Sequence, residues 1–288
     1  MSAIPIANSI LAVRNAIAIV RSDGLRIGCV PTMGALHEGH ASLIRSAKAV
    51  SDFVVTTIFV NPTQFGPNED FTKYPRTLEA DCETCAAAGA DLVFAPTAEE
   101  MYPPNAFAFV DVGTLGEHLC GPSRPGHFRG VCTIVMKLFQ IVQPDVAVFG
   151  AKDAQQARII RKMILDLNVP VQLMIAPTVR ERDGLAMSSR NRYLSPLERS
   201  VAPGIYRALC EVRDRALHGE RDVARLESAL RGMLEAIPES RLDYAAIVDD
   251  ETMQPLARID RPALIAVAIF VGKTRLIDNV TIPQTTII

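Results

Sequence analysis

The sequence predicts an α/β protein with a parallel sheet in its first 180 residues, followed by a smaller α+β domain. Three observations lead to this prediction. Short apolar runs alternate with helix-like segments up to about residue 180. Two helical stretches rich in Arg, Ala and Leu then precede three consecutive strand-like runs. Finally, 49% of the 288 residues are hydrophobic, which is enough for a sizeable core.

The first part is expected to wrap a parallel sheet with helices on both faces. The expected strands are residues 25–30, 53–60, 91–95, 146–149 and 171–176, with an edge strand over residues 107–112. The expected helices are residues 41–50, 78–88, 131–142 and 154–167. Ligands of such sheets bind outside the carboxyl ends of the strands. We therefore expect ligand-binding residues in the loops that follow Val30, Val60, Phe149 and Ala176.

The pattern changes after about residue 185. Residues 196–217 and 222–236 are expected to be helical, and residues 242–248, 264–271 and 275–280 to be strands. Helices followed by consecutive strands are typical of an α+β domain with an antiparallel sheet. We place the boundary between residues 178 and 187, and expect domains of residues 1–180 and 181–288.

Composition excludes several classes of function. A formal net charge of −2 provides no general basic face, so nucleic-acid binding is not expected. No stretch reaches the roughly 18 uncharged apolar residues of a membrane span, and the N-terminus lacks the pattern of a signal peptide. The six cysteines are scattered and do not resemble a disulfide framework, which favours a cytosolic compartment with reduced thiols.

The loop after Val30 reads Pro-Thr-Met-Gly-Ala-Leu-His-Glu-Gly-His and opens a helix. Free backbone N–H groups at a helix start favour an anion, and Gly34 and Gly39 permit close approach of a ligand. His37 and His40 lie on one helical face and could hydrogen-bond phosphate oxygens. Two other interpretations stay open: helix capping, and a metal site, which the three-residue spacing disfavours because the His-Glu-x-x-His motif needs four.

Two further loops carry groups suited to a small polar ligand. Asn61 and Gln64 are neutral and bidentate, which suits a substrate with hydroxyls and a carbonyl. Arg124, His127 and Arg129 stand in a Gly/Pro loop before a helix, where they could bind a carboxylate or a phosphate. An ordinary turn and a solvated surface loop are the alternatives.

The last two loops carry cations. Lys152 follows a strand and can reach phosphate as a point charge, with Gln156 one turn along the next helix. Residues 182–191 combine two serine hydroxyls and an arginine with a glycine at the domain boundary, which suits a mobile phosphate clamp. Helix capping by Asp153 and a plain linker are the alternatives.

The order of these loops resembles the nucleotidyltransferase superfamily, in which the paired motifs His-Ile-Gly-His and Lys-Met-Ser-Lys-Ser grip ATP for attack at its α-phosphate. Residues 31–40, 59–65, 124–131 and 183–191 are more narrowly similar to the pantoate–β-alanine ligase family. That resemblance implies a Rossmann-like domain that binds ATP and pantoate, residues 1–180. It also implies a small α+β domain, residues 181–288, that closes over the site.

The family's reaction belongs to pantothenate (vitamin B5) and coenzyme A biosynthesis. The resemblance implies that the carboxylate of (R)-pantoate attacks the α-phosphorus of ATP, so that pyrophosphate leaves and pantoyl adenylate forms. The amine of β-alanine then displaces AMP and gives pantothenate. It also implies that Mg²⁺, with unknown ligands, accompanies the nucleotide in a cytoplasmic homodimer. The partners would be ATP, pantoate and β-alanine, with no nucleic acid and no membrane.

Carried over position by position, the resemblance assigns roles to the loops. The implied ATP-binding residues are Met33, Gly34, Ala35, Leu36, His37, Glu38, Gly39, His40, Gly150, Ala151, Lys152, Asp153, Val179, Met187, Ser188, Ser189 and Arg190. Gln64 and Gln156 match the pantoate-binding glutamines. The groups implied in catalysis are His37, His40, Lys152, Ser188, Ser189 and Arg190. Ala151 stands where the family usually has Glu, which puts any ion pair of that Glu in doubt.

Two alternatives remain at this point. One is another His-x-Gly-His adenylyltransferase whose acceptor bears a phosphate, although the neutral Asn61 and Gln64 argue against such an acceptor. The other is a nucleotide sensor without turnover, or a fragment of a tRNA-binding synthetase. A sensor would bind ATP without releasing pyrophosphate, and the lack of a basic face counts against the RNA version.

Overall fold

The computed structural model describes residues 4–67, 69 and 71–283. The chain divides into two compact units. Unit 1 comprises Met1–Gly116, Ser123–Ala151 and Gln156–Pro177. Unit 2 comprises Glu117–Pro122, Lys152–Gln155 and Thr178–Ile288. None of the helices among the described residues is both long and apolar enough to cross a membrane.

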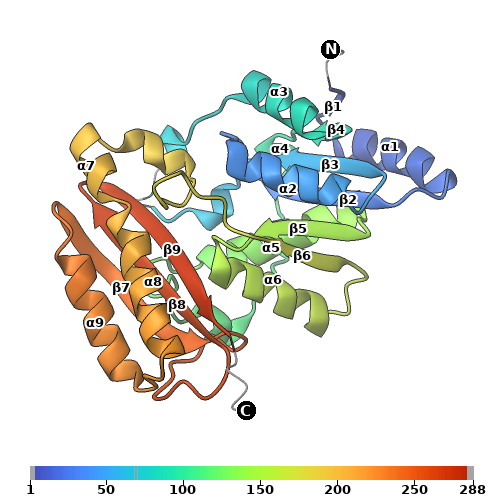
Figure 1. Cartoon of the computed structure of the whole chain (residues 1–288). Coiled ribbons are helices and arrows are strands. Elements are labelled where there is room, and N and C mark those ends of the chain that lie inside the picture. Colours follow the sequence, from blue (N-terminus) through green and yellow to red (C-terminus); the bar gives the residue numbers. More distant parts are fainter. Residues whose placement is uncertain (1–3, 68, 70, 284–288) are drawn as a thin grey trace. The chain divides into compact units, whose positions relative to one another are not determined.

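Unit 1 is built on a six-stranded sheet in the order β1-β4-β3-β2-β5-β6, and every described pair of neighbouring strands is parallel (Figure 1). The strands are β1 Ile6–Ala7, β2 Ile27–Thr32, β3 Phe53–Ile58, β4 Leu92–Phe94, β5 Val146–Gly150 and β6 Gln172–Ala176. The prediction of a parallel sheet is confirmed. The strand order turns back between β2 and β5, so the loops after these two strands border the crevice where such sheets bind ligands.

Helices cover both faces of this sheet. They are α1 Ile10–Ser22, α2 Glu38–Lys48, α3 Leu78–Ala88, α4 Ala98–Met101, α5 His127–Val142 and α6 Ala154–Asp166. On one face, Ile44 of α2 packs in a core cluster with Val30 and Val54. Successive side chains of a strand point to opposite faces, so the fully buried Cys29 and Val55 show that the other face is covered as well.

Two expectations for unit 1 were wrong. Residues 107–112 form no strand, because the side that carries the two phenylalanines faces solvent: Phe107 is 80% exposed and Phe109 is 53% exposed. Residues 10–22, for which no element was expected, form α1. Its buried residues Val13, Ile17 and Val20 have helical spacing, and Ser9 caps it by accepting from the Ala12 N–H.

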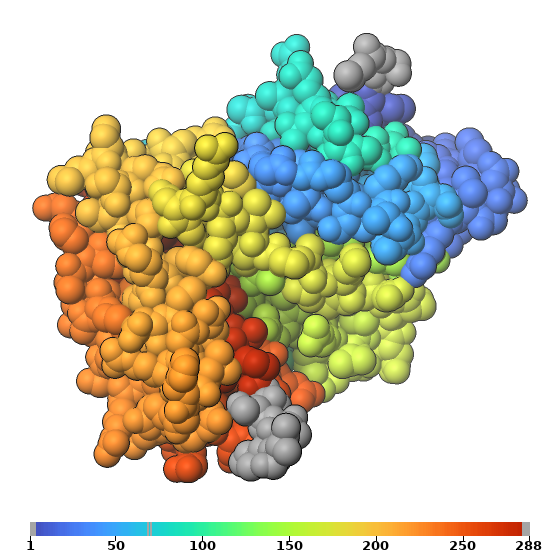
Figure 2. Space-filling view, in the orientation of Figure 1, coloured from blue at the N-terminus to red at the C-terminus, as the bar shows by residue number. Residues whose placement is uncertain are grey.

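Unit 2 packs helices against an antiparallel sheet in the order β7-β8-β9, as expected. Its elements are α7 Pro196–Val201, α8 Gly204–Leu217, α9 Val223–Glu235, β7 Ser240–Asp249, β8 Ala263–Val271 and β9 Thr274–Ile282. The stretch expected as one helix over residues 196–217 is split, because Pro203 lacks the N–H that would continue α7. In Figure 2 the golden and orange side chains of α7–α9 cover most of the red strand atoms of unit 2.

Candidate active site

Two imidazoles stand at the start of α2. The Nδ1 atom of His37, the N-cap residue, accepts from the Gly39 N–H at 3.1 Å, and the Nδ1 atom of His40 accepts from the His37 N–H at 3.3 Å. Since both Nδ1 atoms accept, each neutral ring carries its proton on Nε2. The ring centroids are 4.1 Å apart. The loop thus holds two imidazole N–H donors close together, which could hydrogen-bond an anion.

Five backbone amides of this loop donate hydrogen bonds within the protein, so these five are not the free N–H groups that the sequence suggested. Gly34 donates to Thr32 Oγ1 at 3.2 Å. Ala35 and Leu36 donate to the two carboxylate oxygens of Asp81, at 3.0 and 2.7 Å. The amides of His37 and Gly39 donate to the imidazoles, as described above. An anion at this helix start would therefore meet imidazole Nε2–H groups rather than these five amides.

The loop after β3 lies against the first loop. Pro62–Gln64 form a short 3₁₀ turn that Asn61 caps. The Asn61 amide, almost fully buried, donates to Gln64 Oε1 at 3.1 Å and to the Gly130 carbonyl oxygen at 3.2 Å. The Gln64 amide in turn donates to the sulfur of Met33 at 3.0 Å. These bonds place a neutral amide beside the loop that carries the imidazoles.

Gly130 allows helix α5 to approach this turn. A Cβ atom at this position would stand 2.3 Å from the Thr63 carbonyl oxygen and 2.8 Å from Gln64 Cα. Both distances are far below van der Waals contact, so only glycine fits between α5 and the turn. The position of Gln64 therefore depends on a residue 66 positions later in the sequence.

A pocket of about 120 Å³ opens beside Gln64, lined by residues that include Thr63, Phe65, His127, Arg129 and Gly130. His127 Nε2 lies 2.9 Å from an Arg124 nitrogen and its Nδ1 lies 2.8 Å from the Gln64 carbonyl oxygen. Arginine can only donate, so Nε2 accepts and the Nδ1–H donates to Gln64. This bond fixes the backbone of Gln64 from a second side.

Arg124 is already paired. It forms an ion pair with Glu69 at 2.5 and 2.7 Å. Burial raises the pKa of Glu69, but the hydrogen bond and the charge of Arg124 outweigh burial, so the net pKa of this carboxyl is lowered. The Arg124 charge is therefore compensated inside unit 1.

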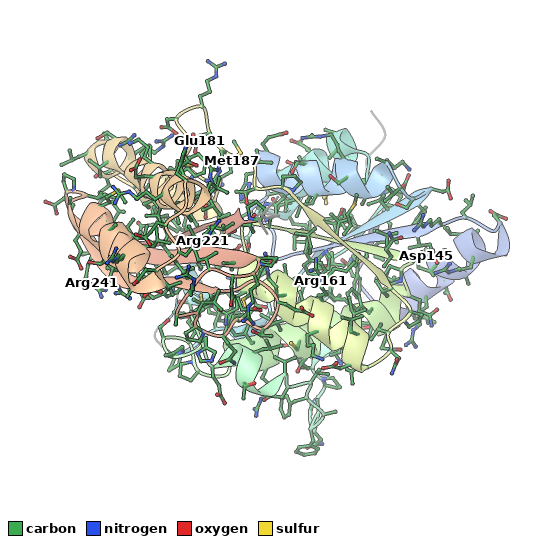
Figure 3. All side chains as sticks on the ribbon, turned by 60° about the horizontal axis from the view of Figure 1, so that its bottom comes forward. Asp145, Arg161, Glu181, Met187, Arg221 and Arg241 are labelled. Carbon is green, nitrogen blue, oxygen red and sulfur yellow. The ribbon has the colours of Figure 1, made fainter. Side chains whose placement is uncertain are left out.

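The segment that follows β6 is braced within unit 2 (Figure 3). The Met187 N–H donates to the Val179 carbonyl oxygen at 3.0 Å, and Ser188 Oγ accepts from the Arg190 N–H at 3.2 Å. The Asn191 amide donates to Glu181 at 3.2 Å, and Arg199 pairs with Glu181 and Asp183. These contacts lie within unit 2 and connect Met187–Arg190, at the start of the 3₁₀ helix Ser189–Tyr193, to the preceding strand-like segment and to α7.

The remaining sequence-predicted positions divide between the units. Gly150 ends β5 and Ala151 follows it; both belong to unit 1, as does Gln156 in α6. Lys152 and Asp153 belong to unit 2, where the Lys152 carbonyl oxygen accepts from the Asn279 amide at 2.9 Å. Sequence reasoning missed Asp81, because nothing in an Ala-rich helix distinguishes a carboxylate that turns inward from one that faces solvent.

A parallel sheet whose strand order turns back between β2 and β5 is the arrangement of α/β nucleotide-binding folds, and the paired imidazoles stand on the loop after β2, beside the point where such folds bind ligands. Comparisons with known proteins narrow this broad class of folds to one family. The family model for pantoate-beta-alanine ligase matches residues 5–281. A pantothenate synthetase from Moorella thermoacetica is 56% identical over 274 residues, 95% of this chain and 97% of that protein.

Solved structures of similar proteins point to the same family. The pantothenate synthetase from Thermus thermophilus superposes with a TM-score of 0.91 at 46% identity, covering 98% of this chain and 100% of that one. A Francisella tularensis pantoate-beta-alanine ligase, crystallised with beta-gamma ATP and beta-alanine, has a TM-score of 0.76 at 34% identity, covering 96% and 97%. The chain belongs to the pantoate–β-alanine ligase family. It is an ATP-dependent enzyme that condenses pantoate with β-alanine, which sets aside both alternatives of the sequence analysis.

Proposed function

We propose that this ligase works in two steps through pantoyl adenylate. A carboxylate oxygen of pantoate attacks the α-phosphorus of ATP and the bond to pyrophosphate breaks. The amine of β-alanine then attacks the acyl carbon, AMP leaves, and the new amide nitrogen loses a proton. The observation that carries this proposal is the pair of imidazoles whose Nδ1 atoms both accept backbone N–H groups, because each ring then keeps its proton on Nε2, where it can donate to a phosphate oxygen.

Adenylyl transfer mainly requires the protein to position the reactants and to stabilise the charge that develops on the phosphates. We assign charge stabilisation at the phosphates to His37, His40, Lys152, Ser188, Ser189 and Arg190. The family match adds Met33–Gly39, Gly150, Ala151, Asp153, Val179 and Met187 as ATP-binding positions. Ala151 carries no carboxylate, so in this chain Lys152 has no ion pair with a neighbour at that position.

We assign pantoate to Gln64 and Gln156. The Gln64 oxygen is held by Asn61, whereas its N–H group donates to the Met33 sulfur, a weak acceptor that a substrate hydroxyl can replace. A neutral amide binds the hydroxyls of pantoate without pairing with its carboxylate, which stays free to attack. The adjoining pocket of about 120 Å³ is large enough for part of a small acid.

We propose that Mg²⁺ enters with ATP and takes its ligands from the phosphates. The donors assigned above are imidazole, ammonium, guanidinium and hydroxyl groups, which suit phosphate better than a metal ion. Across residues 4–67, 69 and 71–283, no group of three or more His, Cys, Asp or Glu side chains could hold a metal. A phosphate-bound Mg²⁺ needs no such group.

The setting of the enzyme is also proposed from the resemblance. We propose a cytoplasmic homodimer that uses only small-molecule substrates; six free cysteines suit a reducing compartment. We propose further that the C-terminal domain closes over bound substrates and excludes water from the acyl adenylate. Hydrogen exchange around residues 183–191 should then fall more with ATP and pantoate together than with ATP alone, and equal exchange in all states would refute closure.

Product analysis tests the two-step proposal. With ATP and pantoate but no β-alanine, chromatography should show pyrophosphate and pantoyl adenylate in amounts close to that of the enzyme, because the adenylate stays bound until β-alanine displaces AMP. Omitting pantoate should abolish both products. Formation of ADP and phosphate instead would contradict attack at the α-phosphorus.

A further inference from the structure

Asp81 of α3 is a buried carboxylate that the two-step scheme does not use. Asp81 is only 2% exposed. Oδ2 accepts from the Ala35 N–H at 3.0 Å and Oδ1 accepts from the Leu36 N–H at 2.7 Å. Within the described part of the chain it forms no ion pair. A buried charge requires compensation, and here the compensation comes from the amides of the loop that leads to His37.

The backbone of this loop is in a conformation that needs support. Gly34 has a φ of +84° and Ala35 a φ of +51°, and the left-handed region is unfavourable for alanine. A Cβ atom at Gly34 would lie 3.0 Å from Asp81 Oδ2 and 3.1 Å from Ile58 Cγ2. The loop therefore runs directly over the carboxylate, and its turn is shaped to bring two successive amides to the two oxygens.

The other end of the loop is fixed separately. Thr32 donates its hydroxyl to the Thr57 carbonyl oxygen at 2.7 Å and accepts from the Gly34 N–H at 3.2 Å. Thr32 thus anchors the loop to β3, and Asp81 anchors it to α3. Leu36 is the immediate neighbour of His37 in the chain, so a shift at Asp81 is passed on to both imidazoles.

We propose that Asp81 is a positioning residue of the ligase: its carboxylate holds Ala35 and Leu36 so that the Nε2–H groups of His37 and His40 meet the phosphates of ATP. Asp81 touches no reacting atom. The proposal rests on the ATP-binding role assigned above to the histidine loop. It predicts that loss of the carboxylate harms adenylate formation and spares the attack of β-alanine on the acyl carbon.

The test uses Asp81→Asn in the full chain, with Glu83→Gln as the matched control. Asn keeps the size of the side chain and one acceptor oxygen, but it turns an NH₂ group toward an amide N–H and leaves one donor unpaired. Glu83 is an exposed residue of the same helix, so its substitution removes the same charge without touching the loop.

For Asp81→Asn we expect kcat/KM for ATP in pyrophosphate release to fall roughly 10- to 100-fold, with unchanged reaction of added pantoyl adenylate with β-alanine. Hydrogen exchange of the Ala35 and Leu36 amides in the ligand-free protein should accelerate. Glu83→Gln should match the original protein throughout.

Three results would overturn the inference: unchanged pyrophosphate release, an equal loss in both half-reactions, or unchanged exchange of the two amides. The exchange measurement needs no substrate, so it also separates this inference from the assignment of ATP to the loop. Faster hydrogen exchange of the two amides together with unchanged kcat/KM for ATP would show that Asp81 fixes the position of the loop but that the loop does not bind ATP.

Discussion

Replacing Gly130 with alanine tests whether the approach of α5 to the turn after β3 sets the position of Gln64. The new Cβ atom would stand 2.3 Å from the Thr63 carbonyl oxygen, whereas ordinary contacts begin near 3.4 Å. The turn or the helix must therefore move by about 1 Å. A displacement of about 1 Å in a substrate-positioning group can cost roughly 10²-fold in rate. We expect kcat/KM for pantoate to fall by about that factor.

The assay is steady-state turnover with varied pantoate and saturating ATP and β-alanine, with circular dichroism to establish that the variant is folded. Gly232→Ala is the control, because Gly232 lies inside α9 with nothing within 4 Å of its added Cβ. It should leave turnover unchanged and stabilise the protein by about 0.5–1 kcal/mol. A folded Gly130→Ala variant with unchanged kcat/KM for pantoate would refute the reasoning.

Three other predictions concern the phosphate donors, the thiols and the ion pair between Arg21 and Asp145. His40→Ala and Lys152→Ala should each lower kcat by roughly 10²–10³-fold without unfolding the protein, and near-normal turnover in either folded variant would remove that residue from the mechanism. Burial raises the pKa of Cys29 to about 12, so iodoacetamide at pH 8 should modify the partly exposed Cys210 well before Cys29, as peptide mass spectrometry can check; equal labelling in the native state would contradict this. Burial opposes ionisation of Asp145, but bonds from the Ile27 N–H and Arg21 outweigh it and lower its pKa. This carboxylate should stabilise the fold above its unfolded pKa and lose that contribution as the pH falls through its folded value. Asp145→Asn should therefore cost about 1 kcal/mol in urea unfolding at pH 7 and progressively less in acid, and a pH-independent difference would count against the ionised form.

Local pattern predicted most of the fold. The helix expected over residues 78–88 is observed as Leu78–Ala88, because Gly89 ends it in the left-handed conformation. The segment over residues 107–112 shows the limit of such reasoning. Its alternation suited a strand, but the pattern cannot tell whether the apolar side meets a core or solvent, and here Phe107 is largely exposed.

Candidate site residues could be chosen from the sequence where their chemistry and spacing are visible. His37 and His40 stood out because two imidazoles three residues apart at a helix start can face one ligand, although the structure shows that both also cap the helix. Asp81 and Gly130 could not be found, because their roles depend on contacts 45 to 69 positions away along the chain. The sequence also suggested free amides in the histidine loop, whereas in the folded chain the amides of four of its residues donate to Asp81 and to the imidazoles.

Attack of the pantoate carboxylate on the α-phosphorus of ATP is tested most directly by tracing a labelled carboxylate oxygen from pantoate into the product. Pantoate labelled with ¹⁸O in its carboxylate is incubated with ATP and β-alanine, and the AMP is analysed by mass spectrometry. If the carboxylate attacks the α-phosphorus, each AMP should carry one ¹⁸O atom and pyrophosphate should carry none. Unlabelled AMP, or label in pyrophosphate or inorganic phosphate, would contradict the pantoyl adenylate mechanism.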